Sequence, residues 1–186
     1  MKELKELRVN DQRLLLNDNL VKSAILPRVS SELERDVVIQ GDTTIEGAVY
    51  ARYFQVEKGK LEVQGAVFTQ IELHVNNDAK GSALFHKAVG STDSIVSLAP
   101  SFRAVFQADI NAKQVKLRNA FVAGSIFADE IVLEDCIVIG GVFASLNLEI
   151  NNSIVGTFNS PLVRISKTIH LLLQIIFLQY SVIGKV

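Results

Sequence analysis

The stretch Gly47-Ala48-Val49-Tyr50 decides the fold, because its order of small, aliphatic and aromatic residues recurs six more times along the chain. The later copies end at Phe68, Phe85, Phe106, Phe127, Phe143 and Phe158. The intervals between successive aromatic positions are similar but not identical, and they are longest around Phe106. A repeat with a nearly constant period of this kind predicts a solenoid, in which each repeat forms one coil and packs on the next.

Each repeat divides further into three apolar stretches. The segment Ile71-Glu72-Leu73-His74-Val75 alternates apolar and polar residues, which is typical of a half-buried strand. Polar corners follow such segments, and their Asn, Asp and Gly residues tolerate the left-handed backbone of a sharp bend. The corners are Glu57-Lys58-Gly59, Asn76-Asn77-Asp78, Glu134-Asp135, Asn151-Asn152 and Ser166-Lys167. Three short strands per coil are therefore expected.

The predicted fold is all-β, a right-handed parallel β-helix (solenoid) of about seven coils. A left-handed helix of hexapeptides is the alternative, but its aliphatic spacing fails after Ile39 and Ile45, where Ala51 and Glu57 follow. We expect the β-helix over residues 37–169, a partly ordered or capping N-terminal extension over 1–36, and an apolar C-terminal cap or association segment over 170–186.

Composition narrows the function classes. The 186 residues are 48 % apolar and 21 % charged, which indicates a globular chain. The net charge of −1 gives no basic excess of the kind that nucleic-acid binders carry. A single cysteine, Cys136, is compatible with a reducing compartment. Because the first residues have no apolar signal core, we expect a cytoplasmic protein.

The end of the chain is unusually apolar. The segment from Ile169 to Ile183 is almost continuously apolar, and its few polar side chains include His170, Gln174 and Gln179. A membrane-spanning helix needs about 20 apolar residues, so burial against protein is favoured and membrane attachment is the alternative.

The segment Val38-Ile39-Gln40-Gly41-Asp42-Thr43-Thr44-Ile45-Glu46-Gly47-Ala48-Val49 resembles the opening of a bactofilin domain. Two shorter segments, 45–51 and 139–144, match the repeat pattern of that family locally, and the resemblance covers about residues 37 to 169. It implies a polymer-forming cytoskeletal protein with a right-handed β-helix that assembles end to end without nucleotide. It also implies contact with the inner membrane surface or with cell-envelope proteins.

Alternation along the strands predicts one lateral surface. If Val67, Thr69 and Leu73 point inward, Phe68 points outward. The predicted outward aromatic stripe is Tyr50, Phe68, Phe85, Phe106, Phe127 and Phe143. It is either a lateral contact surface or the place where the N-terminal extension or the C-terminal tail lies.

The two ends of the solenoid form the second predicted surface. A solenoid has two open ends, which must be capped or paired. The predicted association surface is Ile39, Ile45, Leu171, Leu172, Ile175, Ile176 and Phe177. The apolar tail is either a cap of the open end or the segment that pairs with another subunit.

Chemistry is sparse in this sequence. The histidines His74, His86 and His170 are scattered over different coils, whereas metal and catalytic sites need convergence. We therefore expect no catalytic, metal or cofactor residues and no nucleotide, and a homo-oligomer or polymer. The alternative is a small carbohydrate-active or carbohydrate-binding β-helix, with a groove holding two facing carboxylates. Its best candidates are Asp129, Glu130, Glu134 and Asp135.

Overall fold

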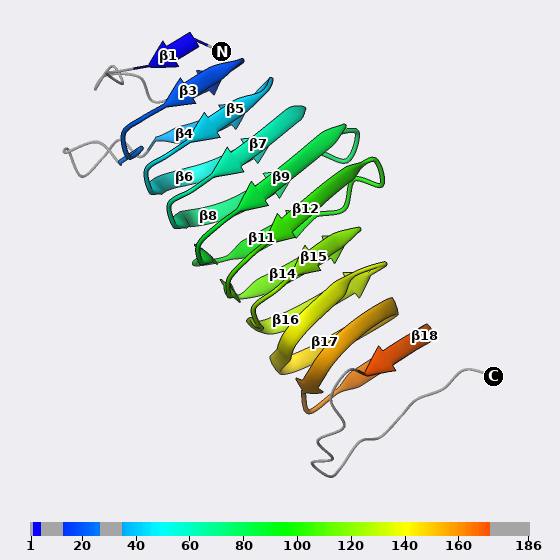
Figure 1. The fold of residues 1–186 in the computed structure, drawn as a ribbon. Coiled ribbons are helices and arrows are strands. Elements are labelled where there is room, and N and C mark those ends of the chain that lie inside the picture. Colours follow the sequence, from blue (N-terminus) through cyan, green and yellow to red (C-terminus); the bar gives the residue numbers. More distant parts are fainter. Residues whose placement is uncertain (1, 5–12, 27–34, 172–186) are drawn as a thin grey trace.

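The structure of the protein is a computed structural model that describes residues 2–4, 13–26 and 35–171. Within these ranges all secondary-structure elements are β-strands, and all pairs of hydrogen-bonded strands are parallel. The chain winds into one rod, a parallel β-solenoid of about eight turns, with β1 (Lys2–Leu4) and β18 (Val163–Leu171) at opposite ends of the rod (Figure 1).

Each turn contributes strands to three faces, whose members pair with the equivalent strands of the neighbouring turns. Face 1 contains β2 (Arg13–Leu16), β4 (Asp36–Ile39), β11 (Ser94–Ser97), β14 (Gln114–Arg118) and parts of β6 (Val49–Val56), β8 (Val67–Val75), β16 (Ile126–Glu134), β17 (Ile137–Asn159) and β18 (Val163–Leu171). Face 2 contains β1 (Lys2–Leu4), β3 (Asn19–Val21), β5 (Thr43–Ile45), β7 (Gly59–Val63), β9 (Gly81–Phe85), β12 (Phe102–Phe106), β15 (Ala120–Val122) and further parts of β17 and β18. Face 3 contains the first parts of β6, β8 and β16, with β10 (Val89–Ser91), β13 (Ile110–Asn111) and a part of β17.

The winding confirms the expected fold. The face 2 strands, which lie toward the viewer in Figure 1, run from upper right to lower left while the rod advances from upper left to lower right. This direction makes the winding right-handed. The turns differ in length, because the turn between the paired positions Val75 and Ser97 is longer than the turn between Ile150 and Ile165.

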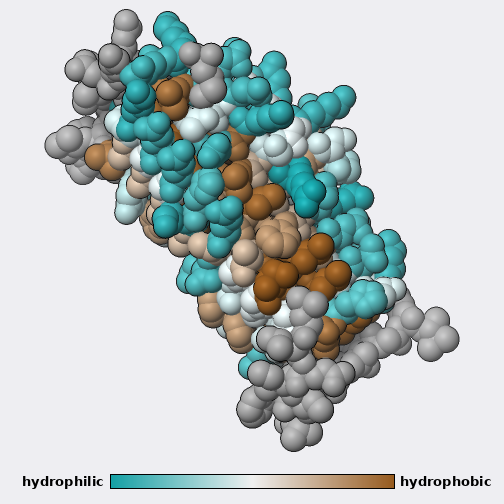
Figure 2. Space-filling model, viewed as in Figure 1, coloured by the Kyte–Doolittle hydropathy of each residue, from teal (hydrophilic) through white to brown (hydrophobic). Residues whose placement is uncertain are grey.

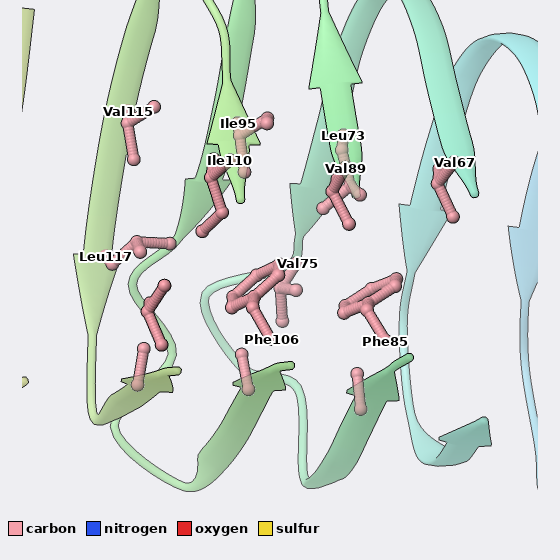
Figure 3. Close-up of a cluster of buried hydrophobic side chains, with 14 of the residues drawn as sticks. Val67, Leu73, Val75, Phe85, Val89, Ile95, Phe106, Ile110, Val115 and Leu117 are labelled. Atoms are coloured by element: carbon pink, nitrogen blue, oxygen red, sulfur yellow. The ribbon is translucent and has the colours of Figure 1, made fainter. Parts of the chain in front are cut away.

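Aliphatic and aromatic side chains from all three faces fill the inside of the rod. Figure 3 shows Val67 and Val89 of face 3, Leu73 of face 1, and Phe85 and Phe106 of face 2 pointing into one interior. All five are at most 2 % exposed. Burying such a side chain fully contributes about 1.5–3 kcal/mol, so stacked columns of this kind hold the coils together.

The corners between face 1 and face 2 use the left-handed backbone that the polar residues predicted. Positive φ angles occur at Gly59 (96°), Asn119 (53°), Asp135 (54°), Asn152 (46°) and Lys167 (59°). Four of these positions lie in the corners expected from the sequence. At Gly81 (φ 136°) an added Cβ would lie 2.0 Å from the carbonyl oxygen of Gly59, so adjacent coils touch there through their backbones.

The rod begins earlier in the chain than residue 37, where the sequence placed its start. β2 pairs with β4 on face 1, and β3 pairs with β5 on face 2. Residues 13–21 therefore add one strand to each of these faces before the expected boundary. In these strands Leu16 and Val21 are fully buried. The segment lacks the small-aliphatic-aromatic motif, which explains why the range predicted from the repeat did not include it.

Candidate functional site

At the C-terminal end of the rod, the last described strand has one edge that no other described strand covers. Among the described strands, β18 pairs only with β17. The side chains that continue the inner columns are less covered here: Val163 is buried, Ile165 and Ile169 are half-buried, and Leu171 is 45 % exposed. A strand of nine residues with an open edge and partly exposed core positions is a ready template for another strand.

The N-terminal end is formed by different residues from those predicted. Ile39 and Ile45 are both 0 % exposed, because the strands β2 and β3 lie over them. Both residues were therefore wrongly assigned to the association surface. The outermost described strands at this end are β2 on face 1 and β1 on face 2. Of the other predicted association residues, Leu172, Ile175, Ile176 and Phe177 lie outside the described residues.

Four of the six predicted stripe residues do form an outward column on face 3. Tyr50 and Phe68 are paired positions with ring centroids 6.1 Å apart. Phe127 and Phe143 are paired likewise, with rings stacked at 5.2 Å. Their exposed fractions range from 37 % to 46 %.

The other two residues of the stripe were predicted wrongly. Phe85 and Phe106 are at most 1 % exposed and stack on each other inside the rod, with centroids 4.9 Å apart. Both belong to face 2, where Phe85 pairs with Val63. In Ala83-Leu84-Phe85 the alanine already points inward, so the phenylalanine two residues later points inward as well.

Small and polar residues occupy the two positions of the face 3 column that the predicted stripe assigned to Phe85 and Phe106. Gly90 pairs with Phe68, Asn111 pairs with Gly90, and Phe127 pairs with Asn111. The aromatic column therefore has a notch two coils wide in its middle. The spacing of about one turn between Val67 and Val89 was a signal in the sequence for this arrangement, since it aligns Gly90 rather than Phe85 with Phe68.

Two shallow grooves meet at this notch. The first, of about 610 Å³, is lined by Tyr50, Ala66, Val67, Phe68, Ala88, Val89, Gly90, Asp109, Asn111 and Phe127. The second, of about 450 Å³, is lined by Asn111, Ala112, Phe127, Ala128, Asp129, Phe143, Ala144, Ser145, Asn159 and Pro161. They share Asn111 and Phe127, so together they form one surface feature along face 3, which we call the notch groove.

Face 2 carries an outward apolar column that the sequence analysis missed. Successive coils place Leu84, Val105, Phe121 and Ile137 at paired positions, and Ile154 follows on the next coil. Figure 2 shows apolar side chains gathered along the rod axis on this side of the molecule. Of these residues Ile137 is the most open, at 37 %. Alternation inside the phrase Ala83-Leu84-Phe85 was the available signal.

The acidic residues singled out in the sequence do not converge. Glu130 accepts a hydrogen bond from the Gln114 amide at 3.0 Å, and Glu134 lies 3.7 Å from Arg118 across the same face. The remaining two lie at corners: Asp129 accepts a bond from Ser145, and Asp135 accepts one from Asn152. Each carboxylate thus pairs with a polar side chain on an adjacent coil, either the preceding or the following one.

Two of the three histidines lie next to carboxylates on the rod. His86 lies 2.9 Å from Glu62, and His74 lies 3.5 Å from Glu72. These two histidines lie on different coils, and His170 is exposed. No group of three or more potential metal ligands occurs within residues 2–4, 13–26 and 35–171.

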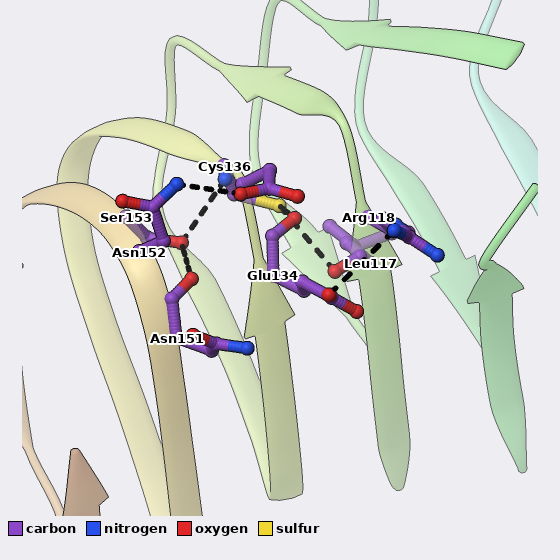
Figure 4. Close-up of polar contacts among 8 residues, drawn as sticks. Leu117, Arg118, Glu134, Cys136, Asn151, Asn152 and Ser153 are labelled. Atoms are coloured by element: carbon purple, nitrogen blue, oxygen red, sulfur yellow. Dashed lines mark hydrogen bonds and ion pairs between the residues drawn. The ribbon is translucent and has the colours of Figure 1, made fainter. Parts of the chain in front are cut away.

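Cys136 is a core residue, 1 % exposed. Its sulfur lies within hydrogen-bonding distance of the carbonyl oxygens of Leu117 (3.4 Å) and Glu134 (3.2 Å), which share its one S–H donor, and its backbone N–H donates to the Ser153 hydroxyl at 3.0 Å (Figure 4). Burial raises the pKa of the thiol to about 11, against the smaller lowering effect of backbone hydrogen bonds.

Comparison with protein-family models, with curated proteins and with solved structures finds no match to this chain. In the part of the chain that the structure describes, no helix has the length and apolarity that crossing a membrane requires. The structure therefore defines this protein by its fold, as an all-β parallel solenoid.

Proposed function

We propose that this protein is a non-enzymatic scaffold whose copies join end to end without a nucleotide, as the resemblance to bactofilins implies. The observation that carries the proposal is the edge of β18 that no described strand covers, with the half-covered core residues Ile165 and Ile169 and the exposed Leu171. An end of this kind lowers its free energy by pairing its backbone groups and burying its apolar side chains.

The opposite end offers strands on the same two faces. β18 has its first part on face 1 and its last part on face 2. At the N-terminal end the outermost strands are β2 on face 1 and β1 on face 2. β1 lies one coil beyond β3, the strand that follows β2 in the chain, so the N-terminal end of the rod projects one rung further on face 2 than on face 1. If the last part of β18 in one copy pairs in parallel with β1 of the next, the inner column of Ile169 and Leu171 continues toward Asn19 and Val21, and on face 1 one rung remains between β18 and β2.

Such a contact joins two different surfaces, so it is heterologous and does not close on itself. Each added copy presents the same free end again. The product is an open filament in which the inner columns run through successive subunits, rather than a dimer.

The test is the size of the purified protein without nucleotide. We expect filaments in negative-stain electron microscopy and large particles in light scattering. Ile169→Asp places a charge at the half-covered end of an inner column, so we expect particles near the 20.4 kDa of one chain with an unchanged circular dichroism spectrum.

Ser166→Asp is the matched control, because this exposed residue lies on the same strand and the change adds the same charge. It should leave the assembly intact. Uniform particles of one chain for the wild type, or equal particle size for the wild type and Ile169→Asp, contradict the proposal.

The catalytic form of the carbohydrate hypothesis has no comparable support. It requires two carboxylates facing one another in a groove. Among the described lining residues, Asp109 is the carboxylate of the first groove and Asp129 that of the second. Both are tied to neighbours: Asp109 accepts the Ser125 N–H at 2.8 Å, and Asp129 accepts the Ser145 hydroxyl.

A further inference from the structure

We propose that the notch groove on face 3 binds a neutral, linear polysaccharide lying along the rod. This inference is independent of end-to-end assembly, because it concerns the side of the rod. The groove combines what such a ligand requires, namely aromatic rings for the C–H faces of the sugar rings and hydrogen-bonding groups for their hydroxyls.

The aromatic rings stand on both sides of the notch. Phe68 lies on one side and Phe127 on the other, three coils apart, which is about 14 Å at the usual strand spacing. The ring of Phe68 leans over Gly90, since a Cβ built on that glycine would lie 3.3 Å from the Phe68 ring carbon Cδ2. Sugar units can therefore contact ring surfaces at both ends of the notch and the backbone of Gly90 between them.

The polar groups of the groove are available to a ligand. The side chains of Asn111 and Asn159 make no hydrogen bond to another residue in the described part of the chain. Asp109 and Asp129 each use Oδ1 for a neighbouring coil, and their Oδ2 atoms have no partner among the described residues. A carboxamide both donates and accepts, and a carboxylate accepts, which suits hydroxyl groups.

The charge of the groove selects a neutral ligand. Asp109 and Asp129 are its charged lining residues, and no lysine, arginine or histidine is among the described residues that line it. An acidic polysaccharide or a nucleic acid would meet two carboxylates without a compensating cation. Neutral sugars meet no such repulsion.

The backbone of this face argues for a glycan over a peptide. An extended peptide gains most of its affinity by adding to a free strand edge. Here β10 is paired with β8 and β13, and β13 is paired with β10 and β16, so no backbone edge is free at the notch. Recognition must come from side chains alone.

The experiment measures binding of neutral oligosaccharides to the full-length protein. Cellohexaose, xylohexaose, laminarihexaose and mannohexaose are screened by saturation-transfer NMR, with hexagalacturonate as the acidic probe, and the best ligand is titrated by calorimetry. We expect at least one neutral oligosaccharide to bind and the acidic one not to bind. Phe127→Ala and Asn111→Ala should each weaken binding about tenfold or more.

Two further variants keep the result interpretable. Phe121→Ala removes an aromatic ring from the face 2 column, outside the groove, and should leave the affinity unchanged. Gly90→Phe deletes no contact but fills the notch, and should abolish binding. Circular dichroism and thermal unfolding show whether each variant is folded.

Three outcomes overturn the proposal. One is that none of the neutral oligosaccharides binds the wild type. Another is that binding persists at full strength in both Phe127→Ala and Gly90→Phe. The third is that reduced casein, an unfolded polypeptide, binds in a manner sensitive to Phe127→Ala while the oligosaccharides do not, which would make the groove a peptide site.

Discussion

Buried hydroxyl groups are the weak points of the rod at the scale of single residues. Thr69 is fully buried on face 3, between Ala51 and Ser91, and its hydroxyl has no hydrogen-bond partner among the described residues. An unsatisfied buried hydroxyl costs about 1–3 kcal/mol. We predict that Thr69→Val, which keeps the shape and removes this group, raises the free energy of unfolding by about 1 kcal/mol, measured by urea denaturation.

Ser91 provides the matched control one coil further along. Its hydroxyl donates to the carbonyl oxygen of Ile71 at 2.8 Å, so Ser91→Ala should lower the free energy of unfolding. The two changes delete a hydroxyl from the same inner column and differ in whether that hydroxyl is bonded. Equal signs for both variants would contradict the argument.

The thiol of Cys136 should be unreactive in the folded protein. Its pKa is raised from 9.0 to about 11 by burial, so the thiolate is scarce at pH 8. We predict that a disulfide reagent such as DTNB labels no thiol in the native protein within minutes at pH 8 and labels one per chain in urea. Fast labelling without denaturant would mean that the corner between β16 and β17 opens locally.

The raised pKa also sets the direction of a pH effect. The folded state holds the thiol proton more tightly than the unfolded state, whose pKa is near 9.0. The contribution of Cys136 to stability is therefore complete below pH 9 and is lost as the pH rises through about 11.

Side-chain orientation was predictable in the coils where the small-aliphatic-aromatic motif lies on face 3. Val67 points inward and Phe68 outward, as alternation requires. Phe85 and Phe106 do not point outward, because their copies of the small-aliphatic-aromatic motif lie on face 2 and not on face 3. The pairing of Val89 with Val67 shows which residues of the next coil lie on face 3. The same misplacement hid the notch at Gly90 and Asn111.

At the scale of elements, the corner between face 1 and face 2 has a position that most coils fill with Asn or Asp. Asn119, Asp135 and Asn152 adopt the left-handed backbone there, but the last corner has Lys167 with φ 59°. The left-handed conformation costs about 1–2 kcal/mol for an ordinary residue and less for Asn. We predict that Lys167→Asn raises the thermal unfolding midpoint by a few degrees, an increment of about 1 kcal/mol.

Lys116→Asn is the comparison for that corner. Lys116 lies in the middle of β14 with an extended backbone, where Asn has a poorer strand propensity. This variant should be neutral or slightly destabilised. A gain of the same size at both positions would show that loss of positive charge, rather than backbone conformation, is responsible.

Strands and corners could be read from the sequence because their causes are local. Alternation sets the faces, and Asn, Asp and Gly set the bends, as at Gly59 and Asp135. The first strands, β2 and β3, were missed because residues 13–21 contain no aromatic phrase, although Leu14, Leu16 and Val21 fall at the inner positions. The ends of the rod therefore could not be located from the repeat, which is how Ile39 and Ile45 were misassigned.

For the whole molecule, end-to-end joining predicts a specific filament geometry. Face 2 has ten described rungs from β1 to β18, two of them from β17, so one subunit advances the rod by about 48 Å at a spacing of about 4.8 Å. Averaged electron micrographs should show an axial repeat of that length, and fibre diffraction should show a meridional reflection at about 4.8 Å. A repeat of about twice that length would instead require copies that alternate in direction, joined C-terminal end to C-terminal end through antiparallel contacts between two β18 edges. Because the proposed joint pairs β18 with β1 in parallel, finding the doubled repeat would exclude it even if filaments form.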